Sequence, residues 1–312
     1  MRRTNQYDEI QPTRNHRYRL QIHTALKLGL TLNPNNRYTL NDEQEAKLFN
    51  IDFQPIKRLF FDIETSPLIA YSWRIGYKIN LPYDNIIQHA KIICISYKWE
   101  NEDKVYSLSW DKDLCDKQMS INFVKVANQA DEIIAHNGDR FDIKWLRTRC
   151  IFHRVPMFPK YRTLDTLKKA KAHFNFPNNK LDTIVQYLGV GAKIKHEGFD
   201  MWRKCLEGDK QALKDMIRYC EGDIIALEDA FFVMQNYIKN NTHAGVINNQ
   251  LKASCPSCGS QDVALIKNNF TALGTIKRQL ECNPCGYVYE TSNSAWRNYL
   301  EFKQNEMIKG VS

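Results

Sequence analysis

Long apolar runs are absent from this sequence. No stretch approaches the roughly eighteen residues that a membrane-spanning helix needs. The basic start, MRRTNQYDEI, is followed by no apolar stretch, which excludes a secretory signal there. Internal repeats and low-complexity tracts are missing too. We therefore expect a cytoplasmic protein without membrane contact.

The cysteines give little sign of a disulfide framework. The chain has nine, an odd number. Five are isolated in the sequence: Cys94, Cys115, Cys150, Cys205 and Cys220. An odd, scattered set fits buried thiols in a reducing compartment better than paired half-cystines. The other four form two CxxC pairs near the C-terminus and are interpreted separately below.

Length and charge narrow the class of protein. At 312 residues the chain is long enough for one large domain with smaller attachments. Its formal net charge of +9 favours a polyanionic partner, because Lys and Arg release counterions from phosphates on binding. An ordinary basic protein without such a partner is the alternative that composition leaves open.

The order of the expected elements divides the chain into four parts. Residues 1–56 are polar and contain two expected helices, either a small helical module or a packing appendage. Residues 57–240 alternate strands with helices. Residues 241–252 are typical of a linker, and residues 253–312 hold the cysteine pairs and an amphipathic helix.

The second part carries most of the regular structure. The segments RLFFDI, KIICISYKW, DKVYSLSW and EIIAHN are typical of strands, and the middle two are typical of a hairpin. Helices are expected near 112–130 and 139–152, and in TLDTLKKAKAHF, LDTIVQYLG and the long run that begins DKQALKD. Strands with interspersed helices predict an α/β sheet flanked by helices on both faces.

Two carboxylates stand close together on the first predicted strand. Asp62 and Glu64 are two residues apart, so their side chains project to the same face, while Phe61 and Ile63 can anchor the other face in a core. Like charges on an otherwise apolar strand repel each other and are costly to desolvate. A bound divalent cation removes that conflict. The alternative is a polar strand end at the surface.

Further carboxylates follow at two later positions. Asn137 follows an apolar strand, and Asp142 lies about one turn into the next helix. Tyr219 and Asp223 are four residues apart and therefore share one helical face. Apolar residues come directly after Asp223, which predicts a partly buried position.

Taken in order, these motifs resemble the DEDD family of 3′–5′ exonucleases, the DnaQ-like group with an RNase H-like fold. The matching motifs are DIET at 62–65, Asn137-x3-Phe141-Asp142-x3-Leu146, and Tyr219-x3-Asp223. One subgroup has histidine five residues before the last aspartate, where this chain has Arg218. Tyr219 instead matches the tyrosine subgroup, which is similar to the exonuclease domains of family B DNA polymerases and to phage stand-alone members.

The resemblance implies a metal-dependent 3′–5′ exonuclease that acts on the 3′ end of single-stranded nucleic acid, with DNA favoured. It implies two Mg²⁺ or Mn²⁺ ions held by four carboxylates: Asp62, Glu64, Asp142 and Asp223. Hard cations prefer such oxygen ligands. Tyr219 suits orienting a water better than acting as a base, because the tyrosine pKa is about 10. An exoribonuclease of the same fold and a non-catalytic nucleic-acid-binding protein are the alternatives.

Other residues are candidates for contact with the substrate. Aromatic and cationic residues alternate over 71–83, where Trp73 could stack on bases and Arg74 could follow the backbone. A surface hairpin without a ligand explains the segment equally well. Asn137, Phe141 and Lys180 are further candidate substrate contacts. Lys180 could reach a phosphate, and a solvated lysine is the alternative. Asp165 is expected to cap a helix or to support the metal site, rather than to bind metal itself.

The C-terminal cysteines indicate a second metal centre. Cys255, Cys258, Cys282 and Cys285 form the pairs CPSC and CNPC, and a glycine that permits a tight turn follows each. The pattern resembles a zinc ribbon, with a closed, structural Zn²⁺ site and KNNFTALGTIKRQLE as its hairpin. Such a module could bind nucleic acid, or a protein partner in replication or repair.

Overall fold

The structure is a computed structural model that describes residues 56–76, 78–100, 102–191 and 198–309. The predicted N-terminal helical segment, 1–56, lies outside these residues except for its last position. Contacts divide the chain into two compact units. One is Arg58–Asp229, and the other contains residues 230–309. The boundary falls within a single long helix.

The first unit is built on a five-stranded mixed sheet in the order β5-β4-β1-β6-β7. The strands are β1 (Arg58–Thr65), β4 (Ile92–Trp99), β5 (Tyr106–Ser109), β6 (Glu132–Ala135) and β7 (Thr163–Asp165). β4 runs antiparallel to both β1 and β5, whereas β6 is parallel to both β1 and β7. This arrangement confirms the predicted strands and the α/β class.

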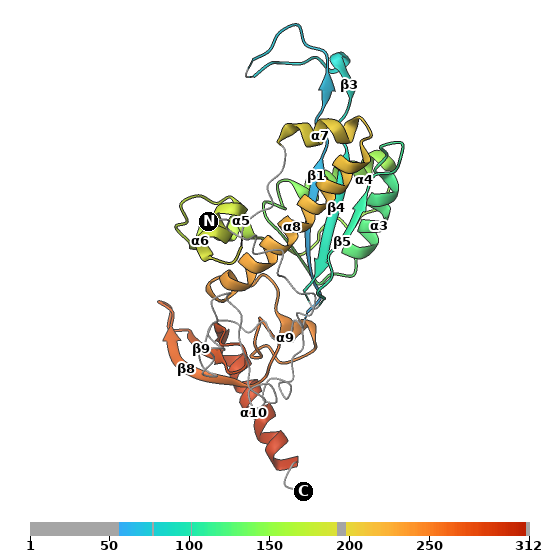
Figure 1. The fold of residues 1–312 in the computed structure, drawn as a ribbon. Helices are drawn as coiled ribbons and strands as arrows, with labels where there is room; N and C mark the ends of the chain where they lie inside the picture. Colours follow the sequence, from blue (N-terminus) through green and yellow to red (C-terminus); the bar gives the residue numbers. More distant parts are fainter. Residues whose placement is uncertain (1–55, 77, 101, 192–197, 310–312) are drawn as a thin grey trace, which may run out of the picture. The chain divides into compact units, whose positions relative to one another are not determined.

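Helices cover both faces of this sheet. The helices of this part of the chain are α3 (Lys117–Ala127), α4 (Asp142–His153), α5 (Thr166–His173), α6 (Leu181–Leu188), α7 (Phe199–Leu206) and α8 (Lys210–Met234). Phe61 and Ile63 of β1 pack into a core with residues of α3 and α4. Cys94 of β4 packs on the opposite face with residues of α7 and α8. Figure 1 shows these two helices lying over the sheet. The side chains of Asp62 and Glu64 alternate with Phe61 and Ile63 and therefore lie on the α8 face.

A narrow arm extends from the sheet between β1 and β4. It consists of β2 (Ile69–Ala70), the 3₁₀ turn η2 (Tyr83–Asn85) and β3 (Ile86–Gln88), and β2 pairs antiparallel with β3. The amide of Ser66 donates to the Lys91 carbonyl (2.8 Å), which holds the base of the arm closed. The arm projects beyond the end of β1 in Figure 1.

The second unit contains the cysteine-rich module. Its elements are η3 (Gln235–Tyr237), α9 (Ala244–Ile247), β8 (Val263–Phe270), β9 (Ile276–Cys282), β10 (Val288–Ser292) and α10 (Asn293–Lys309). The strands form an antiparallel sheet in the order β10-β9-β8, which confirms the predicted hairpin. Tyr289, Trp296 and Tyr299 join the four cysteines in a small core. The segment 241–252, expected to be a linker, contains α9, and its Ala244 amide donates to the Pro256 carbonyl (2.9 Å).

Two elements were not expected. The segment TLDTLKKAKAHF was expected to form a helix with Asp165 as a candidate cap, and the helix does begin at Thr166, but the first three residues of the segment form the strand β7. Pairing with the edge of β6 and burial of Leu164 outweigh the local helical pattern there. The helix α7 was not expected. It buries Met201 and Cys205 but is short, so its pattern spans only two turns.

Candidate functional site

Three carboxylates converge on the α8 face of the sheet. Asp62 and Glu64 come from β1, and Asp223 comes from α8. Each offers one oxygen, and the three oxygens lie within 4.8 Å of one another. Asp223 is buried, with 5% of its surface exposed, while the two strand carboxylates are half-buried. Negative groups at this spacing repel one another, and hard-cation coordination by oxygen relieves that repulsion. The chemistry of this donor set therefore fits a divalent ion such as Mg²⁺ or Mn²⁺.

The fourth predicted carboxylate lies beside this trio. Asp142 is the first residue of α4 and is 1% exposed. Its Oδ1 accepts a hydrogen bond from the Ile63 amide (3.0 Å), so it is attached to β1 between Asp62 and Glu64. Burial, and then the negative charge of Asp62, raise the pKa of Asp142 well above its usual range. Its oxygens are not among those that approach one another within 4.8 Å.

A strained turn places Asp142 at the end of β6. Asn137 has a positive φ of 67°, and a Cβ at Gly138 would lie 2.4 Å from the Ala135 Cβ, so the turn needs glycine at 138. The carboxyl of Asp165 accepts from the amides of Asn137 (3.0 Å) and Asp139 (3.3 Å). It thereby fixes the turn that leads into α4.

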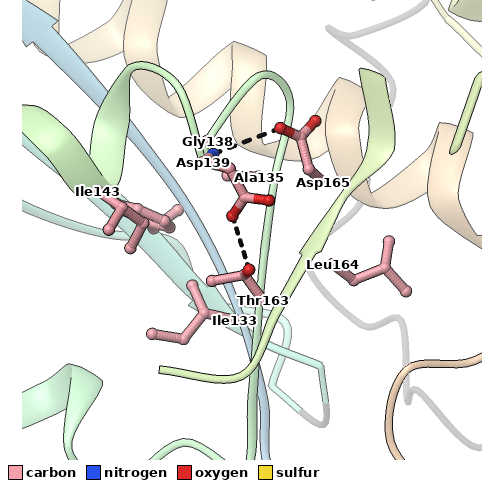
Figure 2. A pocket seen from close by; sticks show the side chains of 9 residues that line it. Ile133, Ala135, Gly138, Asp139, Ile143, Thr163, Leu164 and Asp165 are labelled. Carbon is pink, nitrogen blue, oxygen red and sulfur yellow. Dashed lines mark hydrogen bonds between the residues drawn. The ribbon is translucent and has the colours of Figure 1, made fainter. Parts of the chain in front are cut away.

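Asp165 also begins the next helix. Its Oδ1 accepts from the amides of Leu167 (3.0 Å) and Lys168 (3.2 Å), which confirms the predicted N-cap of α5. Figure 2 shows the pocket next to the turn, where Asp139 accepts from the Thr163 hydroxyl (2.6 Å). The other residues lining it are mainly apolar, so this pocket belongs to the packing of the turn.

Helix α8 brings two further groups to the cluster. Tyr219 lies one turn before Asp223, is half-buried, and makes an edge contact with the Trp202 ring (6.3 Å between centroids). Cys220 is fully buried, and its thiol lies 3.6 Å from both the Oδ2 and the main-chain oxygen of Asp62. Burial raises the pKa of Cys220, so its thiol keeps the proton that it can donate.

The Cys220 contact was missed from the sequence, where this cysteine was interpreted only as an isolated thiol. Its position three residues before Asp223 was the available signal, because residues three apart on a helix are neighbours.

The predicted substrate contacts come from segments other than β1 and α8, which carry the carboxylate trio. Trp73 and Arg74 are exposed on the arm between β2 and β3. Phe141 is partly exposed next to Asp142 and makes an edge contact with Trp145. Lys180 is exposed immediately before α6. Asn137 uses its main chain to hold the turn before α4.

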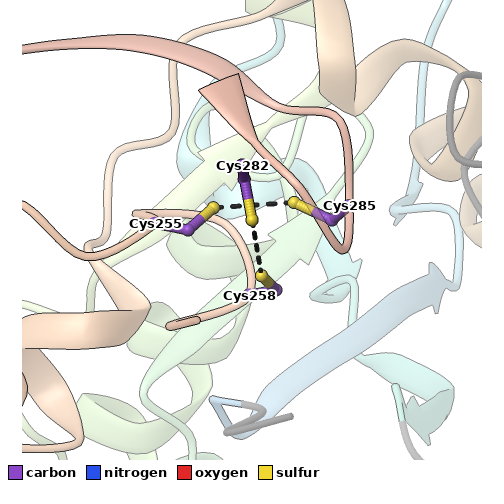
Figure 3. Close-up of side chains that lie close together, drawn as sticks. All are labelled: Cys255, Cys258, Cys282 and Cys285. Carbon is purple, nitrogen blue, oxygen red and sulfur yellow. Dashed lines mark hydrogen bonds between the residues drawn. The ribbon is translucent and has the colours of Figure 1, made fainter. Parts of the chain in front are cut away.

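The second unit contains a separate thiol cluster. Figure 3 shows the sulfurs of four buried cysteines facing one another: Cys255, Cys258, Cys282 and Cys285. Cys255 lies 3.5 Å from Cys285, and Cys258 lies 3.5 Å from Cys282, measured between Sγ atoms. Gly259 and Gly286 have φ of 81° and 68°. Their amides donate to the carbonyls of Cys255 and Cys282, which closes two matching turns. Four convergent thiols fit a tetrahedral Zn²⁺.

No described helix is long and apolar enough to cross a membrane. A search of curated proteins found no match. The chain is similar in structure to the family B DNA polymerase from the hyperthermophilic archaeon Pyrobaculum calidifontis, with a TM-score of 0.45 and 15% identity. That match covers 58% of this chain and 25% of the polymerase chain.

A family model described as the RNase_H superfamily matches residues 59–233. Except for Arg58 at the start of β1, this range contains the five-stranded sheet, and it contains all four carboxylates. It agrees with the predicted RNase H-like fold and with the acidic cluster at the centre of that fold. The chain belongs to the RNase H superfamily.

Proposed function

We propose that this protein is a metal-dependent 3′–5′ exonuclease of the DEDD family, tyrosine subgroup, acting on single-stranded nucleic acid, with DNA favoured. The observation that carries the proposal is the convergence of carboxylate oxygens from Asp62, Glu64 and Asp223 within 4.8 Å. Asp142, hydrogen-bonded to the same strand, supplies the fourth carboxylate. A nuclease fold implies a nucleic-acid substrate. The 3′–5′ direction of digestion goes beyond the fold and is part of what we propose.

The four carboxylates would hold Mg²⁺ or Mn²⁺. Two such ions, when bound, supply a nucleophilic hydroxide and stabilise the leaving oxygen in phosphodiester hydrolysis. The rigid supports of the site favour this role, because the Ile63 amide orients Asp142 and the Asp165 carboxyl holds the turn before it. Geometry fixed before binding lowers the cost of reaching the transition state.

Tyr219 would orient the attacking water. It lies one turn from Asp223 on the same face of α8, and its contact with Trp202 restricts the ring. A tyrosine hydroxyl can both donate a hydrogen bond to a water and accept one from it, which suits Tyr219 to holding the water in place. Phe141, Asn137 and Lys180 are the proposed contacts to the terminal nucleotides. The partly exposed ring of Phe141, next to Asp142, suits stacking on a base.

We also propose a structural Zn²⁺ at the four cysteines, in a ribbon spanning 253–312 that follows a nuclease domain of residues 57–240. Complete enclosure by thiolates leaves no open position for substrate, so this ion would stabilise the fold. Lys277 and Arg278 on β9 support a role in holding the nucleic-acid strand, while a replication or repair protein is the alternative partner.

The test is a nuclease assay on matched single-stranded DNA and RNA, each labelled at either the 3′ or the 5′ end. With Mg²⁺ or Mn²⁺, the 3′ label should be released at once as a mononucleotide, and the 5′-labelled strand should shorten in single steps. Faster digestion of RNA would instead favour an exoribonuclease. Binding without cleavage under every metal condition would favour the non-catalytic alternative.

A further inference from the structure

The arm formed by β2, η2 and β3 is unusual because large apolar side chains between its two strands face solvent. Trp73 and Ile75 are fully exposed, and Tyr71 and Tyr83 are each nearly three-quarters exposed. These side chains add little to the stability of the fold. Apolar groups gathered on a surface in this way mark a site of interaction.

The base of the arm is held firmly to the strands that carry the acidic cluster. Besides the amide of Ser66, the Lys91 amide donates to the Ser66 hydroxyl (2.9 Å), which joins the ends of β1 and β4. Asn85 and Tyr71 are linked by two hydrogen bonds across the arm (2.9 and 3.2 Å). Ile69 follows Glu64 by only five residues, so the exposed rings start close to the end of the carboxylate-bearing strand.

The charges of the arm favour a polyanion. Arg74 lies next to Trp73, and Lys78 follows shortly after, while Asp84 is the only acidic residue between β2 and β3 in the sequence. Aromatic rings stack on unpaired bases of any sequence, and neighbouring cations contact the phosphates. The arm carries exposed aromatic rings and cationic side chains within a few residues of each other.

We propose that this arm binds the single-stranded segment adjoining the 3′ end, with Trp73 stacking on a base and Arg74 and Lys78 contacting phosphates. The inference rests on the proposed function, which supplies the substrate class. On this proposal, the affinity for long single strands depends on the arm, whereas the chemical step of hydrolysis at the terminus depends on the carboxylates.

Binding can be measured without cleavage, in EDTA, from the fluorescence anisotropy of a labelled oligothymidylate of about 15 nucleotides. Trp73→Ala should weaken binding roughly 10-fold, from the loss of one stacked base. Trp73→Phe should retain most of the affinity. The matched control is Phe152→Ala, which removes an exposed ring at the opposite end of α4 from Asp142. Unchanged affinity in Trp73→Ala would overturn the proposal.

Two further measurements separate the arm from the catalytic site. The double variant Arg74→Gln, Lys78→Gln should reduce the slope of log affinity against log salt by about 1.4, or about 0.7 for each lost phosphate contact. Hydrolysis of the p-nitrophenyl ester of thymidine 5′-monophosphate, which offers no second nucleotide for the arm to bind, should fall less in Trp73→Ala than digestion of the long strand. An equal loss on the two substrates would contradict the proposal. A wild-type protein that cleaves nothing would defeat the proposed function, while the anisotropy series would still decide the role of the arm.

A second inference comes from an independent observation, the contact between Cys220 and Asp62. A buried thiol can donate to a carboxylate oxygen, and the thiol of Cys220 lies 3.6 Å from Oδ2 of Asp62. The same thiol lies 3.6 Å from the main-chain oxygen of Asp62, so it contacts both the side chain and the backbone of that residue. We infer that Cys220 is a positioning residue that orients the Asp62 carboxylate for metal binding.

The test is calorimetric titration of Mn²⁺ into zinc-loaded protein. Cys220→Ala should weaken Mn²⁺ binding about 10-fold, the usual effect of losing a group that orients a metal ligand. Cys220→Ser keeps a donor and should bind nearly as well as wild type. Cys205→Ala is the matched control, because it removes a buried thiol from the same core without a hydrogen bond to a carboxylate among the contacts described. Equal affinity in Cys220→Ala and Cys205→Ala would overturn this inference alone, whereas wild-type protein that binds no Mn²⁺ would defeat the proposed function.

Discussion

Asp62 illustrates how a single residue can be costly to the fold and useful to the site. Its carboxyl lies close to those of Glu64 and Asp223, and its negative charge raises the pKa of Asp142 after burial has already done so. In the absence of a cation, like charges on neighbouring half-buried side chains reduce the stability of the folded state. Their presence together is explained by a ligand that neutralises them.

A substitution at Asp62 tests that explanation. Asp62→Asn should lower nuclease activity by at least about 100-fold, since a direct ligand should matter no less than the groups that support it. In EDTA its melting temperature should equal or exceed that of wild type, because one repelling charge is gone. Nuclease assays and thermal melting measure the two effects, with the exposed Asp103→Asn as control. Unchanged turnover would contradict the site assignment.

At the scale of elements, Asp116 joins one strand and two helices behind the site. It precedes α3, accepts from the Ile92 amide at the start of β4 (2.9 Å), and accepts from Arg149 of α4 at Nε (2.6 Å) and Nη2 (2.9 Å). His153 contributes a further contact (2.7 Å). Burial alone would raise the pKa of Asp116, but Arg149, the Ile92 amide and His153 together lower it.

This network predicts a pH-dependent difference in stability. Asp116→Asn should lower the free energy of unfolding by about 3 kcal/mol at pH 7, because it leaves the buried Arg149 without its counter-charge. A carboxylate with a lowered pKa contributes stability above its unfolded pKa of about 3.9 and loses it as the pH falls through the folded value. Urea unfolding should therefore give a constant gap between variant and wild type down to about pH 4, and a narrowing gap below. A gap that disappears by pH 5 would contradict the prediction.

Local sequence patterns predicted the elements well where burial of the chain sets the pattern. They predicted less well where pairing with a neighbouring strand determines the backbone conformation. β1 was predicted from a short apolar run and β4 from an alternating one, and both strands are buried along most of their length. β7 has only three residues, and the edge of β6 converts the beginning of an expected helix into a strand. A preference of that kind is set by a distant partner and cannot be detected in a short window.

At the scale of the whole molecule, the two proposed metal centres differ in enclosure. The carboxylates of Asp62 and Glu64 are half-buried, whereas the four cysteines are buried and each pair is closed by its own turn. Carboxylate sites for Mg²⁺ keep exchangeable waters, while a closed set of four thiolates binds Zn²⁺ strongly at neutral pH.

Chelation should therefore separate the two centres. Brief treatment with dilute EDTA should abolish nuclease activity while retaining close to one zinc per chain, measured by elemental analysis after gel filtration. Adding Mg²⁺ alone should restore activity. If zinc were lost in proportion to activity, the four cysteines would hold their ion no more tightly than the carboxylates do, which would contradict the prediction.

The sequence by itself determined which residues carry the chemistry, because carboxylate pairs, CxxC pairs and strand alternation are properties of spacing. It predicted the α/β class, the N-cap at Asp165 and the order of the acidic motifs. Only the tertiary structure decided which of these residues meet. It brought Asp223 to β1, attached Asp142 to the Ile63 amide, and placed Cys220 against Asp62 across 158 positions of chain. Such contacts depend on how a helix packs across a sheet, and local spacing carries no information about that packing.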